Sequence, residues 1–317
     1  MRITRSAPPA AEPLAGRRAR IQARTEQATI DIREADTNVV PAPGEEDFLV
    51  SILNRTPREP RHKRPGQHLH VSDLLNRCLR KFALVERHGV SVRPDRLSSS
   101  DVFTFAQGDA IHDAAKMMAA LAAPETVWGK WSCKCGHLYH EQPCTLSELD
   151  MNELCPQCET PTNHYQEVSM RNDELMIVGN PDLILYYRNI NAFHVTELKS
   201  IANDQWQELA RAKPDHVLQV VFYWFLMREL GYRMTNRVSI IYITKGYLFK
   251  GKPYKEFVLD PEQELHRLDA YLEEARLVMQ SRKNIAILPA RVGCTTEHSA
   301  QAKKCEVCDI CFAKGAP

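Results

Sequence analysis

Two apolar runs near the middle of the chain, residues 179–185 and 195–200, have the composition of β-strands. A short polar segment, Asn189-Ile190-Asn191, lies between them and is typical of a turn. The two runs therefore predict an antiparallel hairpin. If the chain reverses at Asn189 and Ile190, Asp182 lies opposite Glu197, or within one residue of it.

The second strand of this hairpin carries charged residues on one face. Glu197 and Lys199 are two residues apart and project from the same face, while Thr196 and Leu198 point the other way. Two nearby carboxylates are a common way to hold Mg²⁺ or Mn²⁺, and a lysine beside them can orient a water and offset charge on an attacked phosphate. The alternative is a solvated hairpin with a Glu–Lys pair and no function.

Helical and strand patterns alternate around the hairpin. One helix carries Gly108-x-x-x-His112, although a single helical histidine is more often structural than a ligand. Another carries His216, Gln219 and Tyr223 on one stripe. This order predicts an α/β fold with a mixed central β-sheet flanked by helices. The further elements expected are helices over 73–84 (capped by Ser72), 100–121, two split by Pro214 with the second over 215–230, and 261–282, and strands over 237–244 and 254–259.

Composition sets the class of protein. The 317 residues are 44% apolar and 26% charged, with a net charge of +1, so a nucleic-acid surface would have to be a local patch. No apolar run reaches the roughly 18 residues of a membrane span. Residues 1–66 are rich in Pro, Ala, Arg and Glu, which predicts a poorly ordered, partly basic extension.

Ten cysteines indicate metal binding and a reducing, cytoplasmic setting, because their close spacing suits chelation better than disulfides. Cys133-x-Cys135 and Cys155-x-x-Cys158 can present four thiolates to Zn²⁺ and predict a structural zinc ribbon over residues 128–161. Such a closed site adds folding energy rather than catalysis. Three further residues of this region are spare candidates: His137, His140 and Cys144.

A second set of cysteines closes the chain, within residues 294–311. These four could hold zinc among themselves, or they could join the isolated Cys78 to hold an iron–sulfur cluster, which takes four thiolates. The tail cysteines are Cys294, Cys305, Cys308 and Cys311.

The separate motifs occur in a characteristic order, and the series resembles the RecB-like branch of the PD-(D/E)XK nuclease superfamily. Within that branch it is most similar to the iron–sulfur members: CRISPR-associated exonucleases, their phage-encoded relatives and the nuclease domain of AddB-type helicase–nucleases. The resemblance covers about residues 70–312. The motifs that carry it are Cys78, Gly108-x-x-x-His112, Glu167, Gly179-x-x-Asp182, Glu197-x-Lys199, Gln219-x-x-x-Tyr223 and the cysteine tail.

The resemblance implies roles for these residues. Asp182, Glu197, the carbonyl of Leu198 and His112 would bind the catalytic Mg²⁺ or Mn²⁺. Lys199 would act on the nucleophilic water. Further along the chain, Gln219 and Tyr223 would line the site and contact DNA, and Glu167 would be a helper acid behind the ligands.

For the tail, the resemblance implies a [4Fe–4S] cluster on Cys78, Cys294, Cys305 and Cys311, which would staple the two ends of a nuclease domain over residues 67–317. Family tails commonly read C-x-x-C-x₅-C, but Ala302 stands at one of the expected positions. Cys308 is therefore an alternative ligand to Cys294. The zinc-ribbon insert is a second departure, since the smallest members lack it.

The activity implied is metal-dependent hydrolysis of DNA, most simply as a single-strand exonuclease in phage or bacterial recombination, repair or CRISPR adaptation. A recombination or CRISPR-adaptation protein would then be a partner, and no membrane is expected. Two alternatives remain: an endonuclease on the same fold, and a non-catalytic zinc or iron–sulfur protein that binds DNA or assists assembly.

Overall fold

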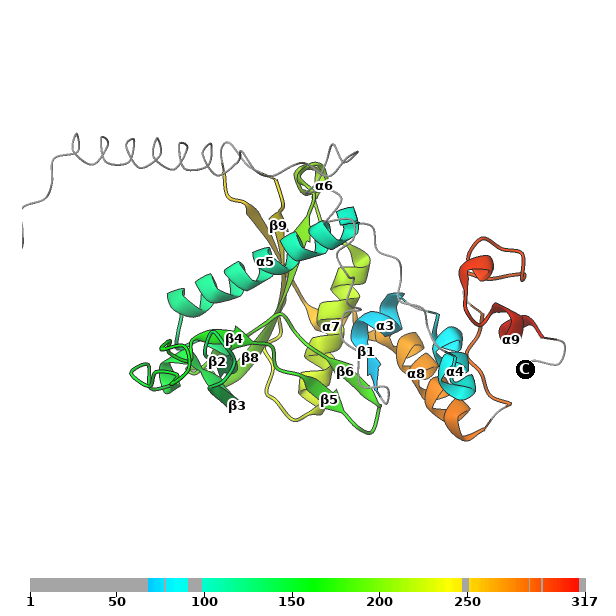
Figure 1. Ribbon diagram of the computed structural model, residues 1–317, viewed down its shortest axis with the longest axis horizontal. Helices are drawn as coiled ribbons and strands as arrows, with labels where there is room; N and C mark the ends of the chain where they lie inside the picture. The colour runs from blue at the N-terminus through cyan, green and yellow to red at the C-terminus, as the bar shows by residue number, and fades with distance from the viewer. Residues whose placement is uncertain are drawn as a thin grey trace, which may run out of the picture. The chain divides into compact units, whose positions relative to one another are not determined.

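The computed structural model describes residues 68–76, 78–90, 99–246, 251–284, 286–291 and 293–313 (Figure 1). All of these belong to one compact unit, Arg58–Pro317. The predictions made for residues 1–66 fall outside the described residues. Within the described part, no helix is long and apolar enough to cross a membrane.

The predicted hairpin is present as strands β7, Leu183–Tyr187, and β8, Ala192–Ile201. Leu183 pairs with Thr196 in an antiparallel register, so Asp182, one residue before the strand, falls opposite Glu197 when the register is extended. The turn residue Asn191 has a positive φ of 48°, a conformation that Asn tolerates better than most residues. The register predicted from the sequence is confirmed.

This hairpin is the middle of a mixed sheet with the strand order β10-β9-β8-β7-β2-β3, and β4 pairs with β2. Strands β8 and β9 are parallel, and the other pairs are antiparallel. The mixed central sheet flanked by helices is therefore confirmed. The remaining bounds are β2 Val127–Ser132, β3 Tyr139–Thr145, β4 His164–Gln166, β9 Val238–Thr244 and β10 Tyr254–Leu259.

Helix α7, Pro214–Glu229, lies at the centre of the fold (Figure 1). It contacts β8 and β9 of the central sheet and also α3, Val71–Asn76, and a small second sheet. Its sequence is apolar on nearly every side, so burial on more than one face stabilises it. The small sheet has the order β1-β6-β5, with bounds β1 Leu69–His70, β6 Ile177–Gly179 and β5 Met170–Asn172.

Helix α5, Ser99–Ala122, crosses the sheet and contacts β8 and β4 (Figure 1). A Cβ at Gly108 would lie 3.0 Å from Ser200 Oγ on β8, so the glycine permits the close approach of helix and strand. The short helix α6, Asn203–Glu208, follows β8 directly. The packing of α5 against β8 and β4 brings His112 of the Gly108-x-x-x-His112 motif close to Asp182, just before β7.

Two helix predictions were wrong in detail. The helix expected over 73–84 is divided into α3 and α4, Leu79–His88, because Cys78 has extended backbone angles (φ −71°, ψ 104°) and stands at the N-cap of α4. The helix expected from Pro261 begins as two 3₁₀ turns, and the α-helix α8 spans Leu268–Lys283. The first break matters chemically, since it removes Cys78 from a helix interior.

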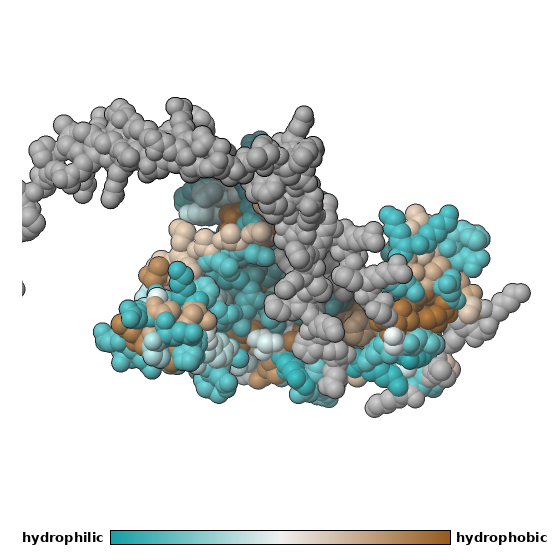
Figure 2. Space-filling view, in the orientation of Figure 1, coloured by the Kyte–Doolittle hydropathy of each residue, from teal (hydrophilic) through white to brown (hydrophobic). Residues whose placement is uncertain are grey.

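A separate apolar cluster joins α4 to the C-terminal residues. Leu84 on α4 packs with Val307 and Cys311, and α9, Cys308–Phe312, lies beside it. Figure 2 shows apolar surface where α4 and α9 lie. The two ends of the described chain therefore meet through hydrophobic packing.

Candidate functional site

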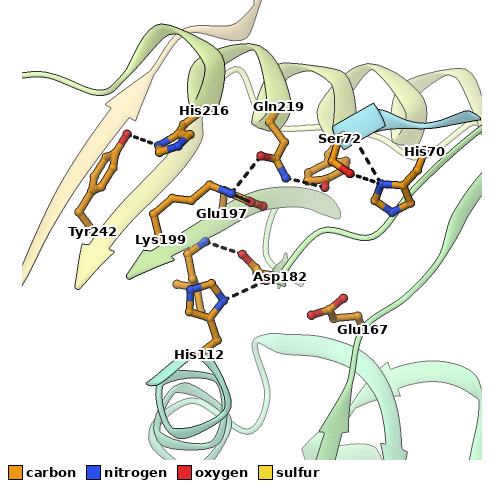
Figure 3. Close-up of polar contacts among 12 residues, drawn as sticks. His70, Ser72, His112, Glu167, Asp182, Glu197, Lys199, His216, Gln219 and Tyr242 are labelled. Atoms are coloured by element: carbon orange, nitrogen blue, oxygen red, sulfur yellow. Dashed lines mark hydrogen bonds and ion pairs between the residues drawn. The ribbon is translucent and has the colours of Figure 1, made fainter. Parts of the chain in front are cut away.

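The carboxylates of Asp182, just before β7, and of Glu197, within β8, lie close together (Figure 3). Glu197 is 2% exposed, and the side chain of Asp182 is 13% exposed. The backbone N–H of Leu198 donates to Asp182 Oδ2 at 2.8 Å, which holds this carboxylate against β8. A solvated hairpin would expose both groups, so the hairpin is not the solvated one of the alternative interpretation, although it does contain the Glu–Lys pair.

Helix α7 positions the lysine of the hairpin. Lys199 Nζ donates to Glu197 Oε1 at 2.6 Å and to Gln219 Oε1 at 3.0 Å. The amide of Gln219 in turn donates to the Tyr223 hydroxyl at 2.9 Å. A Cβ at Gly179 would lie 2.7 Å from the Tyr223 ring, so this glycine makes room for the tyrosine. Two residues of the predicted stripe, Gln219 and Tyr223, are thus connected to the carboxylates through Lys199.

Helix α5 brings His112 to the same place (Figure 3). Its Nδ1 lies 3.5 Å from Asp182 Oδ1. His112 Nε2 and Glu197 Oε2 are both buried, and neither has a hydrogen-bond partner among the described residues. Buried polar atoms are nearly always paired, so the two atoms fit a ligand set that is completed by a cation.

A second lysine, which the sequence analysis did not single out, completes the group. Lys116 lies one helical turn after His112 and is 7% exposed. Its Nζ is 2.6 Å from Glu167 Oε1 and 3.8 Å from Asp182 Oδ1. The sequence signal was the i,i+4 spacing from His112, which places both side chains on one face of the helix.

The electrostatics of the pair of carboxylates are unequal. Burial and the neighbouring Asp182 carboxylate raise the pKa of Glu197 to about 8. Burial also acts to raise the pKa of Asp182, but the hydrogen bond and charge of His112, with Lys116 and Lys199, bring it below its usual range. Burial and Asp182 raise the pKa of Glu167 despite the contact with Lys116. Glu197 and Glu167 therefore hold a proton more readily than exposed carboxyl groups, and a cation bound nearby would favour their ionised forms.

The third residue of the stripe, His216, contacts strand β9. Its Nδ1 lies 2.8 Å from the hydroxyl of Tyr242 on β9, and that hydroxyl accepts the backbone N–H of Lys213 at 2.9 Å. Burial and the ammonium groups of Lys199 and Lys213 lower the pKa of His216 to about 4. A neutral imidazole therefore borders the site next to Lys199.

The predicted zinc-ribbon cysteines are brought together. The sulfur atoms of Cys133, Cys135, Cys155 and Cys158 all lie within 4.8 Å of one another, so the group could hold a metal ion. Among the described residues it is the one group packed this closely, and the ligand atoms of the carboxylate site are spread more widely. The three spare candidates near it do not join the group. Strand β2 precedes Cys133 and belongs to the central sheet, so this module is continuous with the fold.

The five remaining predicted cysteine ligands line one recess with three basic residues. Arg80 Nε donates to Cys311 Sγ at 3.3 Å, and Arg291 donates to the Cys311 carbonyl at 2.6 Å. The sulfurs do not form a close single-ion group of the kind seen at Cys133, which weighs against the tail alone holding one zinc. The cysteines of the recess are Cys78, Cys294, Cys305, Cys308 and Cys311.

No protein-family model matches this chain, and no curated protein matches it. Among solved structures, the chain is similar to the alkaline exonuclease LHK-Exo from Laribacter hongkongensis. The superposition has a TM-score of 0.34 and 11% sequence identity, and it covers 69% of this chain and 95% of the exonuclease. At this level the neighbour is distant, so the function must be argued from the geometry of the site.

Proposed function

We propose that this protein is a metal-dependent deoxyribonuclease with a restriction-endonuclease-like core of the PD-(D/E)XK, RecB-like type. One observation carries the proposal: Glu197 is buried beside Asp182 with an unpartnered oxygen, while Lys199 is held in place by Gln219. Lys199 pairs with Oε1 of this carboxylate, but a buried carboxylate oxygen without a partner, such as Oε2, is costly to the fold. A function that requires a divalent cation explains why the chain keeps it.

The donor set fits Mg²⁺ or Mn²⁺. Asp182, Glu197, the carbonyl of Leu198 and His112 would hold the ion, and the imidazole favours Mn²⁺. When bound, the ion supplies Lewis acidity toward a phosphodiester. Lys199 orients the attacking water and offsets the charge that develops on the phosphate.

Other residues of the site act on the bound strand. Gln219 holds Lys199 and is itself held by Tyr223, so the pair keeps the ammonium aimed at the carboxylates. Gln219 is only partly buried and would contact the DNA, whereas Tyr223 is 2% exposed and supports Gln219 from beneath, so we propose no DNA contact for the tyrosine. Glu167 stands behind the ligands, tied to Lys116. The substrate is DNA, preferentially single-stranded and cut from an end, in a cytoplasmic setting of recombination, repair or CRISPR adaptation with a protein partner from that pathway.

A nuclease assay with separately labelled 5′ and 3′ ends tests the proposal. We expect cleavage that needs added Mg²⁺ or Mn²⁺, is faster with Mn²⁺, and leaves circular single-stranded DNA intact. Cleavage of the circle would make the protein an endonuclease on the same fold. Binding of DNA without cleavage under any divalent cation would contradict the proposal and leave a non-catalytic DNA-binding protein.

We also propose that both cysteine groups hold metal. The close four-sulfur group suits Zn²⁺, which takes four thiolates in structural sites. The recess at the chain end suits a [4Fe–4S] cluster on Cys78, Cys305, Cys311 and either Cys294 or Cys308. The N-cap position of Cys78 supports this assignment, since it frees the side chain from the helix interior.

Serine substitutions in the recess should identify the cluster ligands. We expect Cys305→Ser to lose the iron and the brown colour of anaerobically purified protein, because a cluster with three thiolates is held weakly. Of Cys294→Ser and Cys308→Ser, one should lose iron and the other should keep it. Cys144→Ser, outside the recess, is the control. Iron-free wild-type protein with zinc at both groups would contradict the cluster.

A further inference from the structure

Lys116 is anchored inside the carboxylate cluster rather than at its rim. It is 7% exposed and comes from the same face of α5 as His112. The 2.6 Å contact with Glu167 holds its ammonium group in place, and Asp182 Oδ1 is 3.8 Å away on the other side. A lysine buried in this way acts as a fixed positive charge between two carboxylates.

Each oxygen of the Asp182 carboxylate has a neighbour that fixes its direction. Its Oδ2 accepts the N–H of Leu198. Its Oδ1 faces His112 Nδ1 at 3.5 Å on one side and Lys116 Nζ on the other. In two-metal nucleases the ions lie about 3.5–4 Å apart and share a carboxylate. The ammonium of Lys116 lies 2.6 Å from Glu167 Oε1 and 3.8 Å from Asp182 Oδ1, the two carboxylates that would be available to a second ion.

The charge balance agrees with this placement. When a cation favours the ionised form of all three, the carboxylates of Asp182, Glu197 and Glu167 face two ammonium groups, those of Lys116 and Lys199, and carry one negative charge in excess. A single divalent cation changes this one negative charge in excess to one positive charge. The negative charge of one phosphodiester then neutralises the site. A second divalent cation would be repelled by Lys116 at close range.

We infer that the catalytic site takes a single divalent cation and that Lys116 stands in for the second one. This inference rests on the proposed nuclease function and deepens it. Lys116 is a positioning residue: it holds Glu167 away from the ion and keeps one oxygen of Asp182 directed toward His112. Glu167 is therefore a partner of Lys116 and contributes no metal ligand.

The test counts the Mn²⁺ ions bound by the full chain. The free Mn²⁺ that remains in solution is measured by electron paramagnetic resonance, and the bound number follows by difference. An ion is counted as bound at the carboxylate site if its binding is lost in Glu197→Gln. We expect one such ion in the wild type, one in Lys116→Arg, two in Lys116→Gln, and one in Lys116→Gln/Glu167→Gln. Glu167→Gln alone should weaken Mn²⁺ binding by about 10-fold at most, the effect of an outer partner.

Two Mn²⁺ ions that Glu197→Gln abolishes would overturn the inference if they are found in the wild type, and the only variant that must be folded for this result is Glu197→Gln. A single ion in folded Lys116→Gln would also overturn it. The proposed function fails differently: one Glu197-dependent ion together with no DNA cleavage would refute the nuclease and leave the single-ion site standing. Cleavage by a protein that binds two such ions would support the nuclease and refute the single-ion site.

Discussion

Replacing Glu197 by Gln should lower the rate of DNA cleavage by about 10³-fold or more, which corresponds to roughly 4 kcal/mol of transition-state stabilisation. Glutamine keeps the shape of the side chain but offers no anionic oxygen to a divalent cation. The hydrogen bond from Lys199 can still reach the amide oxygen, so the local packing survives. The measurement is the single-turnover rate with labelled single-stranded DNA and Mn²⁺.

The same substitution should also change how the stability of the protein depends on pH, which can be measured separately from DNA cleavage. The pKa of Glu197 is raised in the folded state, to about 8 from an ordinary 4.5. Between these two pKa values the folded protein holds a proton that the unfolded chain releases. The contribution of Glu197 to the free energy of unfolding is therefore fully present below the unfolded pKa and is lost as the pH rises toward 8. Glutamine does not titrate. Without added divalent cation, the variant should lose less thermal stability than the wild type between these pH values.

Glu208 provides a matched control. It lies exposed on α6, so Glu208→Gln makes the same chemical change away from the cluster. We expect wild-type cleavage and a wild-type pH profile of stability. Full activity in Glu197→Gln, with divalent metal present, would remove this residue from the catalytic machinery.

Replacing Cys158 by Ser should remove one Zn²⁺ per chain and unfold the region around the four-cysteine group. Structural zinc sites bind with about 10–16 kcal/mol in isolated peptides, and that energy is folding energy. The hydroxyl of Thr160 lowers the pKa of Cys158 to about 5, so this thiol is ready to bind as a thiolate. The measurements are zinc content and the amide hydrogen exchange of residues 133–158.

Cys144 is the control for this group. It is half-buried on β3, close in sequence, and its sulfur is outside the four-sulfur set. Its backbone carbonyl accepts the indole N–H of Trp131, a contact that substitution by serine keeps. Cys144→Ser should retain zinc and exchange protection. An unchanged zinc content in Cys158→Ser would show that this cysteine is not a ligand.

Much of the fold was predictable because it depends on local signals. The hairpin register follows from the period of two along each strand and from the length of the turn at Asn189–Asn191. Strand β10 has the bounds expected from its sequence, and α5 differs by one residue at each end. The four ribbon cysteines were identified from their spacing, because tight turns hold each pair together before any long-range contact forms.

The sequence by itself therefore determined the α/β class, the pairing of Asp182 with Glu197, and the cysteine group that could hold metal. Only the tertiary structure decided the burial of Glu197, the position of Lys116 between Asp182 and Glu167, and the release of Cys78 from a helix interior. The physical reason is that these features depend on how α5 and α4 pack against segments distant in the chain. No local period of hydrophobic residues encodes such a contact.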